Sequence, residues 1–150
     1  MSENKDIKIK IVTPEKTVFE GDFFQATIPT MDGEITILPN HRTYISVVKP
    51  GEIILKNEND KDELSMAVSG GFIEFDSNNQ LTILADTAER ADEIDLERAE
   101  EARKKAEELK NKRIEMDETA YARILVSLDK QLARIRVARK RYSRRNISMQ

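Results

Sequence analysis

The sequence of 150 residues contains no cysteine and no tryptophan, only one histidine, and no long hydrophobic run. The lack of cysteine excludes a disulfide framework, a thiolate metal site and a cysteine nucleophile, and a single histidine excludes a histidine-rich metal site. No apolar run approaches the roughly 20 residues of a membrane span, and residues 1–11 lack a signal-peptide core. The sequence therefore predicts a soluble protein of a reducing compartment.

The charge and the aromatic content exclude further classes of protein. The 25 basic and 28 acidic residues leave a net charge of −3, which excludes a uniformly basic nucleic-acid-binding protein and an acidic disordered chain. The chain is 39% hydrophobic but only 5% aromatic, so we expect a compact, aliphatic core.

The average composition hides a boundary between two different halves. All five glycines and all four prolines lie within residues 1–71, and both residue types oppose helix interiors. Residues 1–88 carry a net charge of −7, whereas residues 89–150 carry +4. We predict two domains, 1–88 and 89–150.

The first half has the pattern of short strands. Ile7, Ile9 and Ile11 alternate with Lys8 and Lys10, the period of two that is typical of a strand with one wet face. Further short apolar runs follow, separated by turn signals such as the Pro and Gly residues noted above. Close spacing of this kind predicts an antiparallel β-sandwich or barrel of about 8–10 strands.

The second half has the pattern of two antiparallel helices, which makes the fold class α+β. Asp95 is placed to cap the first helix and Asp117 the second. The predicted apolar stripes are Leu96, Ala99, Ala102, Ala106 and Leu109 on the first helix, and Tyr121, Ile124, Leu125, Leu128, Leu132 and Ile135 on the second. Because an alanine-rich stripe buries little surface, we expect this hairpin to be only marginally stable by itself.

Two features suggest chemistry. His41 follows Glu34 by seven residues, but one such pair does not define an active site, and we interpret His41 as structural or as part of an interface. The basic run near the C-terminus is more specific, and it consists of Arg134, Arg136, Arg139, Lys140, Arg141, Arg144 and Arg145. The charge of this run indicates an anionic partner. One possible function of the chain is therefore that of a sandwich scaffold whose basic tail binds nucleic acid or anionic lipid.

Six short motifs occur in an order that identifies a family. They are Gly33-Glu34, Leu38-Pro39-Asn40-His41, Lys49-Pro50-Gly51, Ser69-Gly70-Gly71-Phe72, Leu84-Ala85-Asp86-Thr87-Ala88 and Ile94-Asp95-Leu96-Glu97-Arg98-Ala99. Together they resemble the epsilon-subunit family of bacterial F-type ATP synthases. The resemblance implies an N-terminal β-sandwich followed by a helical hairpin, as the residue pattern also predicts.

The resemblance further implies a non-catalytic subunit of the F1 central stalk, peripheral to the cytoplasmic face of the bacterial plasma membrane. Its expected partners are the gamma subunit, the c-subunit ring and, transiently, the alpha and beta subunits, with no nucleic acid and only indirect membrane contact. Such a subunit couples proton flow to ATP synthesis, and its hairpin inhibits ATP hydrolysis. Glu34 and His41 match rotor-interface positions. The residues expected to contact the beta subunit are Arg134, Arg136, Arg139, Lys140 and Arg141.

In some relatives the motif at residue 94 binds ATP as a regulatory ligand and holds the hairpin folded; no cofactor, metal or catalytic residue is required. By resemblance the candidate ATP-binding residues are Glu89, Ile94, Asp95, Arg98, Ala99, Lys130 and Arg134. In this picture Asp95 reads the adenine edge, Ile94 and Ala99 pack on the base, and Arg98 and Arg134 face phosphate.

Overall fold

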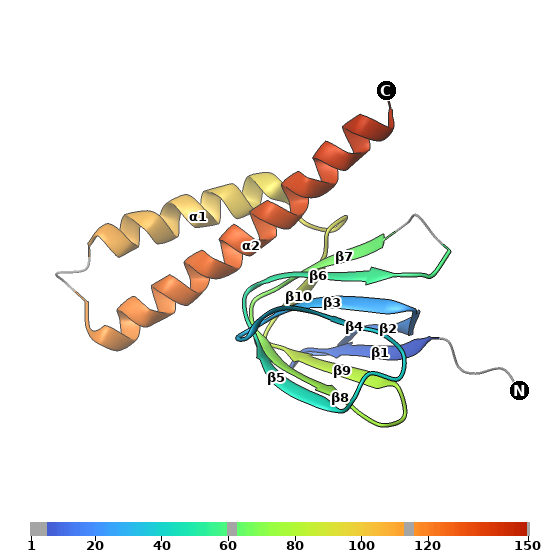
Figure 1. The fold of residues 1–150 in the computed structure, drawn as a ribbon. Coiled ribbons are helices and arrows are strands. Elements are labelled where there is room, and N and C mark those ends of the chain that lie inside the picture. Colours follow the sequence, from blue (N-terminus) through green and yellow to red (C-terminus); the bar gives the residue numbers. More distant parts are fainter. Residues whose placement is uncertain (1–5, 60–62, 113–115, 150) are drawn as a thin grey trace, which may run out of the picture.

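The computed structural model describes residues 6–59, 63–112 and 116–149 and contains a β-sandwich followed by a helical hairpin (Figure 1). The elements are β1 (Ile7–Val12), β2 (Thr17–Phe23), β3 (Gln25–Thr30), β4 (Gly33–Ile37), β5 (Tyr44–Val48), β6 (Gly51–Lys56), β7 (Glu63–Val68), β8 (Gly71–Phe75), β9 (Gln80–Ala85), β10 (Ala88–Arg90), α1 (Leu96–Asn111) and α2 (Glu118–Ser148). The α+β class and the strand number are confirmed. The last strand, β10, runs across the boundary predicted between residues 88 and 89.

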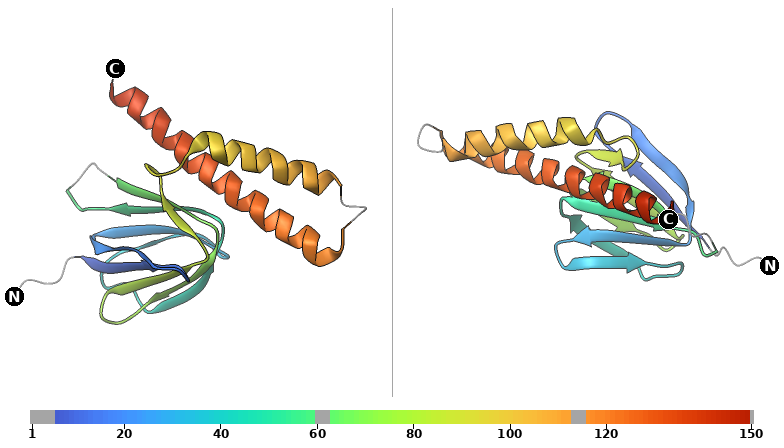
Figure 2. Two further views of the ribbon diagram at one scale, coloured as in Figure 1. Left: turned by 180° about the vertical axis from the view of Figure 1, so that it is seen from behind. Right: turned by 90° about the horizontal axis from the view of Figure 1, so that it is seen from above.

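The strands form one continuous sheet that folds over on itself (Figure 2). Its order is β10-β7-β6-β3-β5-β8-β9-β1-β2, with β4 paired to β3. All pairings are antiparallel except that of β1 with β9, which is parallel and places Ile9 beside Leu81. We predicted an antiparallel sandwich, so this parallel pair differs from the prediction. It arises because β1 lies between β9 and β2 in the sheet. The pairing of β1 with β9 joins segments far apart in the sequence and has no local sequence signal.

The core of the sandwich is aliphatic, as predicted. Ile7, Ile9 and Ile11 are at most 1% exposed, while Lys8 and Lys10 point outward, which confirms the period of two. Phe75 is the largest side chain in this core and is 1% exposed.

Both predicted helix caps are confirmed. The Asp95 Oδ1 atom accepts a hydrogen bond of 3.0 Å from the backbone N–H of Arg98, and the Asp117 Oδ1 atom accepts one of 2.7 Å from that of Ala120. Each cap satisfies a backbone donor that the first helical turn leaves without an intrahelical partner. Neither helix of the described chain has the length and hydropathy that spanning a membrane would require.

The two helices differ in length, with 16 residues in α1 and 31 in α2. The N-terminal part of α2 therefore lies antiparallel to α1, and its C-terminal part continues across the sandwich beside β6 and β7 (Figures 1 and 2). At the crossing, a small apolar cluster joins hairpin to sandwich; it consists of Ala67, Ala91, Ile94, Val137 and Ala138. We call it the junction cluster.

For two residues of the predicted apolar stripes, the prediction of burial is wrong. Leu109 is 47% exposed and Leu132 is 39% exposed, whereas Gln131 and Ala133 are buried. Because α2 packs against both α1 and the sandwich, its buried surface extends around more of the helix than a single stripe.

Gly71 offers a direct test of the strand pairing. Its φ is +139°, and a Cβ atom there would lie 2.0 Å from the backbone oxygen of Leu84 on β9. We expect Gly71→Ala to lower the free energy of unfolding by at least about 3 kcal/mol, because the clash is with backbone rather than with a flexible side chain. Gly33→Ala is the control, since Gly33 also has a positive φ, +109°, but nothing lies within 4 Å of the added Cβ. Urea unfolding measures both; equal losses for the two variants would contradict this account.

Candidate functional site

A cleft of about 520 Å³ lies between the sandwich and the hairpin. One wall comes from β7 and β10 and the other from the start of α1 and the middle of α2. Its lining residues include five of the seven predicted ATP-binding residues, namely Glu89, Asp95, Arg98, Lys130 and Arg134. Residues far apart in the sequence are therefore brought to one place.

Arg134 is the centre of the polar network in this cleft. Its Nε and Nη2 atoms donate to the two carboxylate oxygens of Glu89, at 2.7 and 3.3 Å, and its Nη1 atom donates to Gln131 Oε1 at 2.8 Å. Two parallel hydrogen bonds of this kind fix the guanidinium plane. Gln131 is 8% exposed and was not predicted, because a lone glutamine in a helix carries no chemical signature.

The cleft also holds two cations that the described residues leave without an ion pair, Arg98 and Lys130. The cleft is also lined by three carboxylates, those of Glu89, Glu93 and Asp95. The lining therefore combines cations that can pair with phosphate and carboxylates that can accept hydrogen bonds from hydroxyl and amino groups. A volume of about 520 Å³ falls within the range of small-molecule sites. The residues present therefore fit a nucleotide, provided that a phosphate competes with Glu89 for Arg134.

The two apolar residues of the predicted set lie elsewhere. Ile94 is 8% exposed and packs in the junction cluster, and Ala99 is fully buried. Neither lines the cleft, and Asp95 uses one carboxylate oxygen to cap α1. In this conformation Ile94 packs between hairpin and sandwich and Ala99 is enclosed, so neither side chain faces the cleft.

Most of the basic run on α2 is paired with acids of the same chain. The pairs are Arg134 with Glu89, Arg139 with Glu100, Lys140 with Glu52, Arg141 with Asp92 and Arg144 with Glu63. Arg136 instead is exposed, beside Lys49 and Pro50. Apart from Glu89, sequence reasoning did not single out these acidic partners, which lie as many as 88 residues away along the chain.

His41 packs as a structural residue. Its ring meets those of Tyr44 and Phe75 edge-on, with centroids 6.2 and 6.1 Å apart, and its Nδ1 atom lies 2.8 Å from the carbonyl oxygen of Arg42. Glu34 is exposed at the start of β4, next to the turn that carries Met31, which is 58% exposed. This arrangement gives the imidazole packing contacts and leaves the Glu34 carboxylate in solvent.

The outer face of β5, β8 and β9 carries an apolar patch that sequence reasoning did not single out. Ile45, Val47, Phe72 and Leu84 are 74, 42, 58 and 54% exposed. Val47 pairs with Phe72 and Phe72 with Leu84, so these side chains are neighbours across three strands. The sequence signal that could have revealed this patch is the presence of apolar residues at the strand positions that face outward. Contiguous exposed apolar side chains of this kind indicate a protein-binding surface.

Comparison with known proteins identifies the family. The beta-sandwich domain of the ATP synthase delta/epsilon chain matches residues 6–91. The ATP synthase epsilon chain of Lactiplantibacillus plantarum is 46% identical over 109 residues, covering 71% of this chain and 76% of the relative. That of Herpetosiphon aurantiacus is 41% identical over 140 residues, covering 92% and 98%. This chain belongs to the ATP synthase epsilon-chain family.

A solved structure shares the fold. A chain of the cryo-EM structure of the Euglena gracilis mitochondrial ATP synthase, which contains OSCP, F1 and the c-ring, superimposes with a TM-score of 0.70 at 21% identity, covering 83% of this chain and 76% of that one. As an epsilon chain, the protein is a non-catalytic subunit of the synthase, as predicted.

Glu100 on α1 provides a pH test of the hairpin contacts. The Arg103 guanidinium, 3.1 Å away, lowers the pKa of Glu100; burial opposes this, and Arg139 of α2 lowers it further. Because the folded pKa is below the unfolded one, the stabilisation is present above the ordinary pKa and is lost as pH falls through the lowered value. In a carboxyl-carbon NMR titration, Arg103→Gln should raise the Glu100 pKa more than Arg139→Gln does. The reverse order would be inconsistent with Arg103 as the main cause.

Proposed function

We propose that this chain couples rotation of the central stalk to ATP synthesis by docking the gamma subunit on the apolar patch of β5, β8 and β9. The observation that carries the proposal is this patch on a sandwich of the delta/epsilon family. Phe72 lies at its centre, between Val47 and Leu84. A large, exposed aromatic surrounded by aliphatic side chains is the kind of anchor that dominates protein interfaces.

The turn between β3 and β4 is the proposed contact with the c-subunit ring. Glu34 and Met31 are exposed there, and an exposed carboxylate next to an exposed apolar side chain suits a polar rim around a small apolar contact. His41 supports the neighbouring segment through its ring contacts with Tyr44 and Phe75. Through these contacts the protein is located at the cytoplasmic face of the bacterial plasma membrane without entering it.

The hairpin is the proposed regulatory element. Folded on the sandwich, as in this structure, it permits rotation. When extended, it would present Arg134, Arg136, Arg139, Lys140 and Arg141 to acidic loops of the beta subunits and thereby inhibit ATP hydrolysis. The alternative of nucleic acid or anionic lipid as the partner of this run has less support, because the chain belongs to the ATP synthase epsilon-chain family.

ATP in the cleft between sandwich and hairpin is the proposed regulatory ligand. Arg98, Lys130 and Arg134 would hold phosphate groups, and Glu89 and Asp95 would accept hydrogen bonds from the sugar or base. Because the walls of the cleft belong to both parts of the chain, a ligand there binds only the folded conformation and stabilises it by mass action.

Docking of the gamma subunit can be measured with purified subunits. Phe72→Ser combined with Leu84→Ser should weaken the affinity for gamma by about thirtyfold or more in calorimetry, because the double variant removes the centre of the apolar patch. Val126→Ser is the matched control, since Val126 is an apolar residue of α2 that is 61% exposed. Wild-type affinity in the double variant would overturn the proposed interface.

Binding of ATP can be followed by NMR on the full chain. We expect ATP to shift the amide signals of Ser69 and Thr87, whose side chains are hydrogen-bonded at 2.7 Å on the wall of the cleft. Arg98→Gln with Lys130→Gln should weaken binding about tenfold or more, because each removes a charged donor. Arg123→Gln, an exposed arginine of α2 outside the cleft, should bind as wild type does. Unshifted Ser69 and Thr87 signals would contradict the site.

A further inference from the structure

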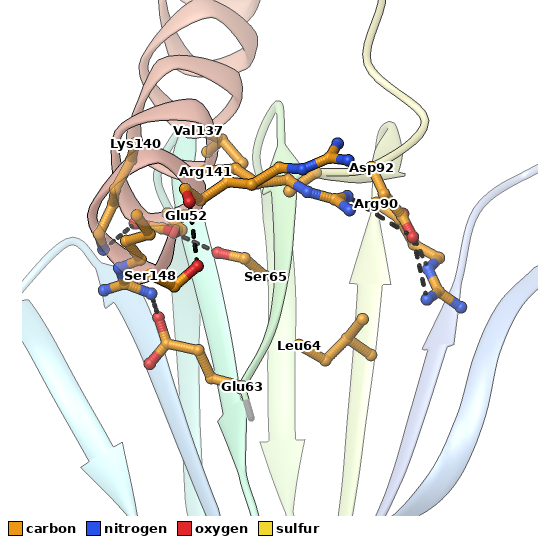
Figure 3. Close-up of a pocket in the computed structure, with 13 residues that line it drawn as sticks. Glu52, Glu63, Leu64, Ser65, Arg90, Asp92, Val137, Lys140, Arg141 and Ser148 are labelled. Atoms are coloured by element: carbon orange, nitrogen blue, oxygen red, sulfur yellow. Dashed lines mark hydrogen bonds and ion pairs between the residues drawn. The ribbon is translucent and has the colours of Figure 1, made fainter. Parts of the chain in front are cut away.

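The C-terminal part of α2 meets the sandwich at a second cleft, of about 580 Å³ (Figure 3). In this cleft the acidic and most of the basic side chains come from different parts of the chain. The carboxylates come from the sandwich and the turn that follows it, namely Glu52 on β6, Glu63 on β7 and Asp92 after β10. Four of the five basic residues come from α2, and they are Lys140, Arg141, Arg144 and Arg145.

Three ion pairs cross this cleft. Lys140 Nζ lies 2.7 Å from Glu52 Oε2, Arg141 Nη1 lies 3.6 Å from Asp92 Oδ2, and Arg144 pairs with Glu63. Lys140 and Arg144 are four residues apart, so they lie on one face of the helix, toward the sandwich.

The carboxylates on the acidic side also have partners outside α2. Ser65 Oγ donates to Glu52 Oε1, Lys56 Nζ lies 3.3 Å from Glu63 Oε2, and Arg90 Nε lies 3.2 Å from Asp92 Oδ1. The Glu52 and Glu63 side chains are only 15 and 16% exposed. Carboxylates that are fixed and partly shielded lose less entropy on pairing, and are screened less by salt, than free surface groups, which favours the pairs of Glu52 and Glu63 with α2.

We propose that these three pairs form an electrostatic latch that keeps the hairpin folded by occupying the basic residues that it needs for inhibition. The inference rests on the proposed function, because it concerns regulation by the same hairpin. Lys140 and Arg141 belong to the set assigned to the beta subunit. They cannot pair with Glu52 and Asp92 and with another acidic surface at once. The latch therefore competes with the catalytic subunits for the same charges and sets how readily the hairpin extends.

The latch predicts a dependence on salt and on the sandwich acids. Exposed charges are screened over about 8 Å at physiological ionic strength, so raising the salt concentration should favour the open hairpin. Neutralising Glu52, Glu63 and Asp92 should have the same effect at low salt and should remove most of the salt response. Neutralising acids on the opposite edge of the sheet should do neither.

The test uses the full chain, whose lack of cysteine allows two spin labels at Ser77→Cys and Ser143→Cys, both exposed positions. In pulsed electron resonance, Glu52→Gln, Glu63→Gln and Asp92→Asn together should raise the ratio of long to short label distances about tenfold or more at 0.15 M salt. The matched control neutralises three exposed acids at and near β2, with Glu15→Gln, Glu20→Gln and Asp22→Asn. A distance distribution equal to that of the control would overturn the latch.

A charge reversal guards against a folding defect. Glu52→Lys alone should open the hairpin, and adding Lys140→Glu should return the short distance, because the pair is restored with its signs exchanged. Failure of the second substitution to close the hairpin would count against a specific pair.

Hydrolysis of ATP by the assembled F1 sector separates the latch from the function on which it rests. Deletion of residues 134–150, which removes all five basic residues assigned to inhibition, should raise hydrolysis, whereas the triple neutral variant should lower it, because the basic residues are released to inhibit. If the deletion leaves hydrolysis unchanged, the proposed inhibitory function fails even if the label distances respond. If the deletion raises hydrolysis but the triple variant keeps the control distances, only the latch fails.

Discussion

The junction between hairpin and sandwich is the contact on which the behaviour of this molecule depends. It consists of a few small apolar side chains around Val137 and Ile94, surrounded by ion pairs. The sandwich, in contrast, has an extensive core of isoleucine, leucine and phenylalanine with almost no exposure. Because burial of apolar area provides most of the stabilisation and exposed ion pairs about 0–1 kcal/mol each, the junction is much weaker than the core of the sandwich.

This difference in strength suits the regulatory role that we propose for the hairpin. In that proposal the sandwich remains bound through its apolar patch while the long helix α2 leaves it, since the patch on β5, β8 and β9 and the surface of β6 and β7 that contacts α2 involve different strands. The cleft proposed to bind ATP and the proposed latch lie at opposite sides of the junction cluster along α2, with Arg134 before Val137 and Lys140 after it. In these two proposals the same folded conformation is stabilised, in one through a ligand and in the other through internal charge.

Much of the fold was predictable from local patterns, and the reasons are physical. The alternation of Ile7 to Ile11 and the caps at Asp95 and Asp117 are encoded within a few residues, so they were predicted and are confirmed. The parallel pairing of β1 with β9 and the exposure of Leu132 depend on tertiary packing and were not. For the site, resemblance supplied five of the residues that line the cleft, but acidic partners of the basic run such as Glu52 pair across long sequence separations that no local pattern reveals.

Urea unfolding followed by methyl NMR on the isolated full chain tests the weakness of the junction most directly. Signals of Val137 and Ala138 report on the junction, and those of Ile9 and Ile83 report on the sandwich core. The account predicts two separate transitions, in which the junction signals change at a lower urea concentration while the core signals remain native. A single coincident transition of all four residues would show that hairpin and sandwich form one cooperative unit, which would contradict a hairpin that detaches from an intact sandwich.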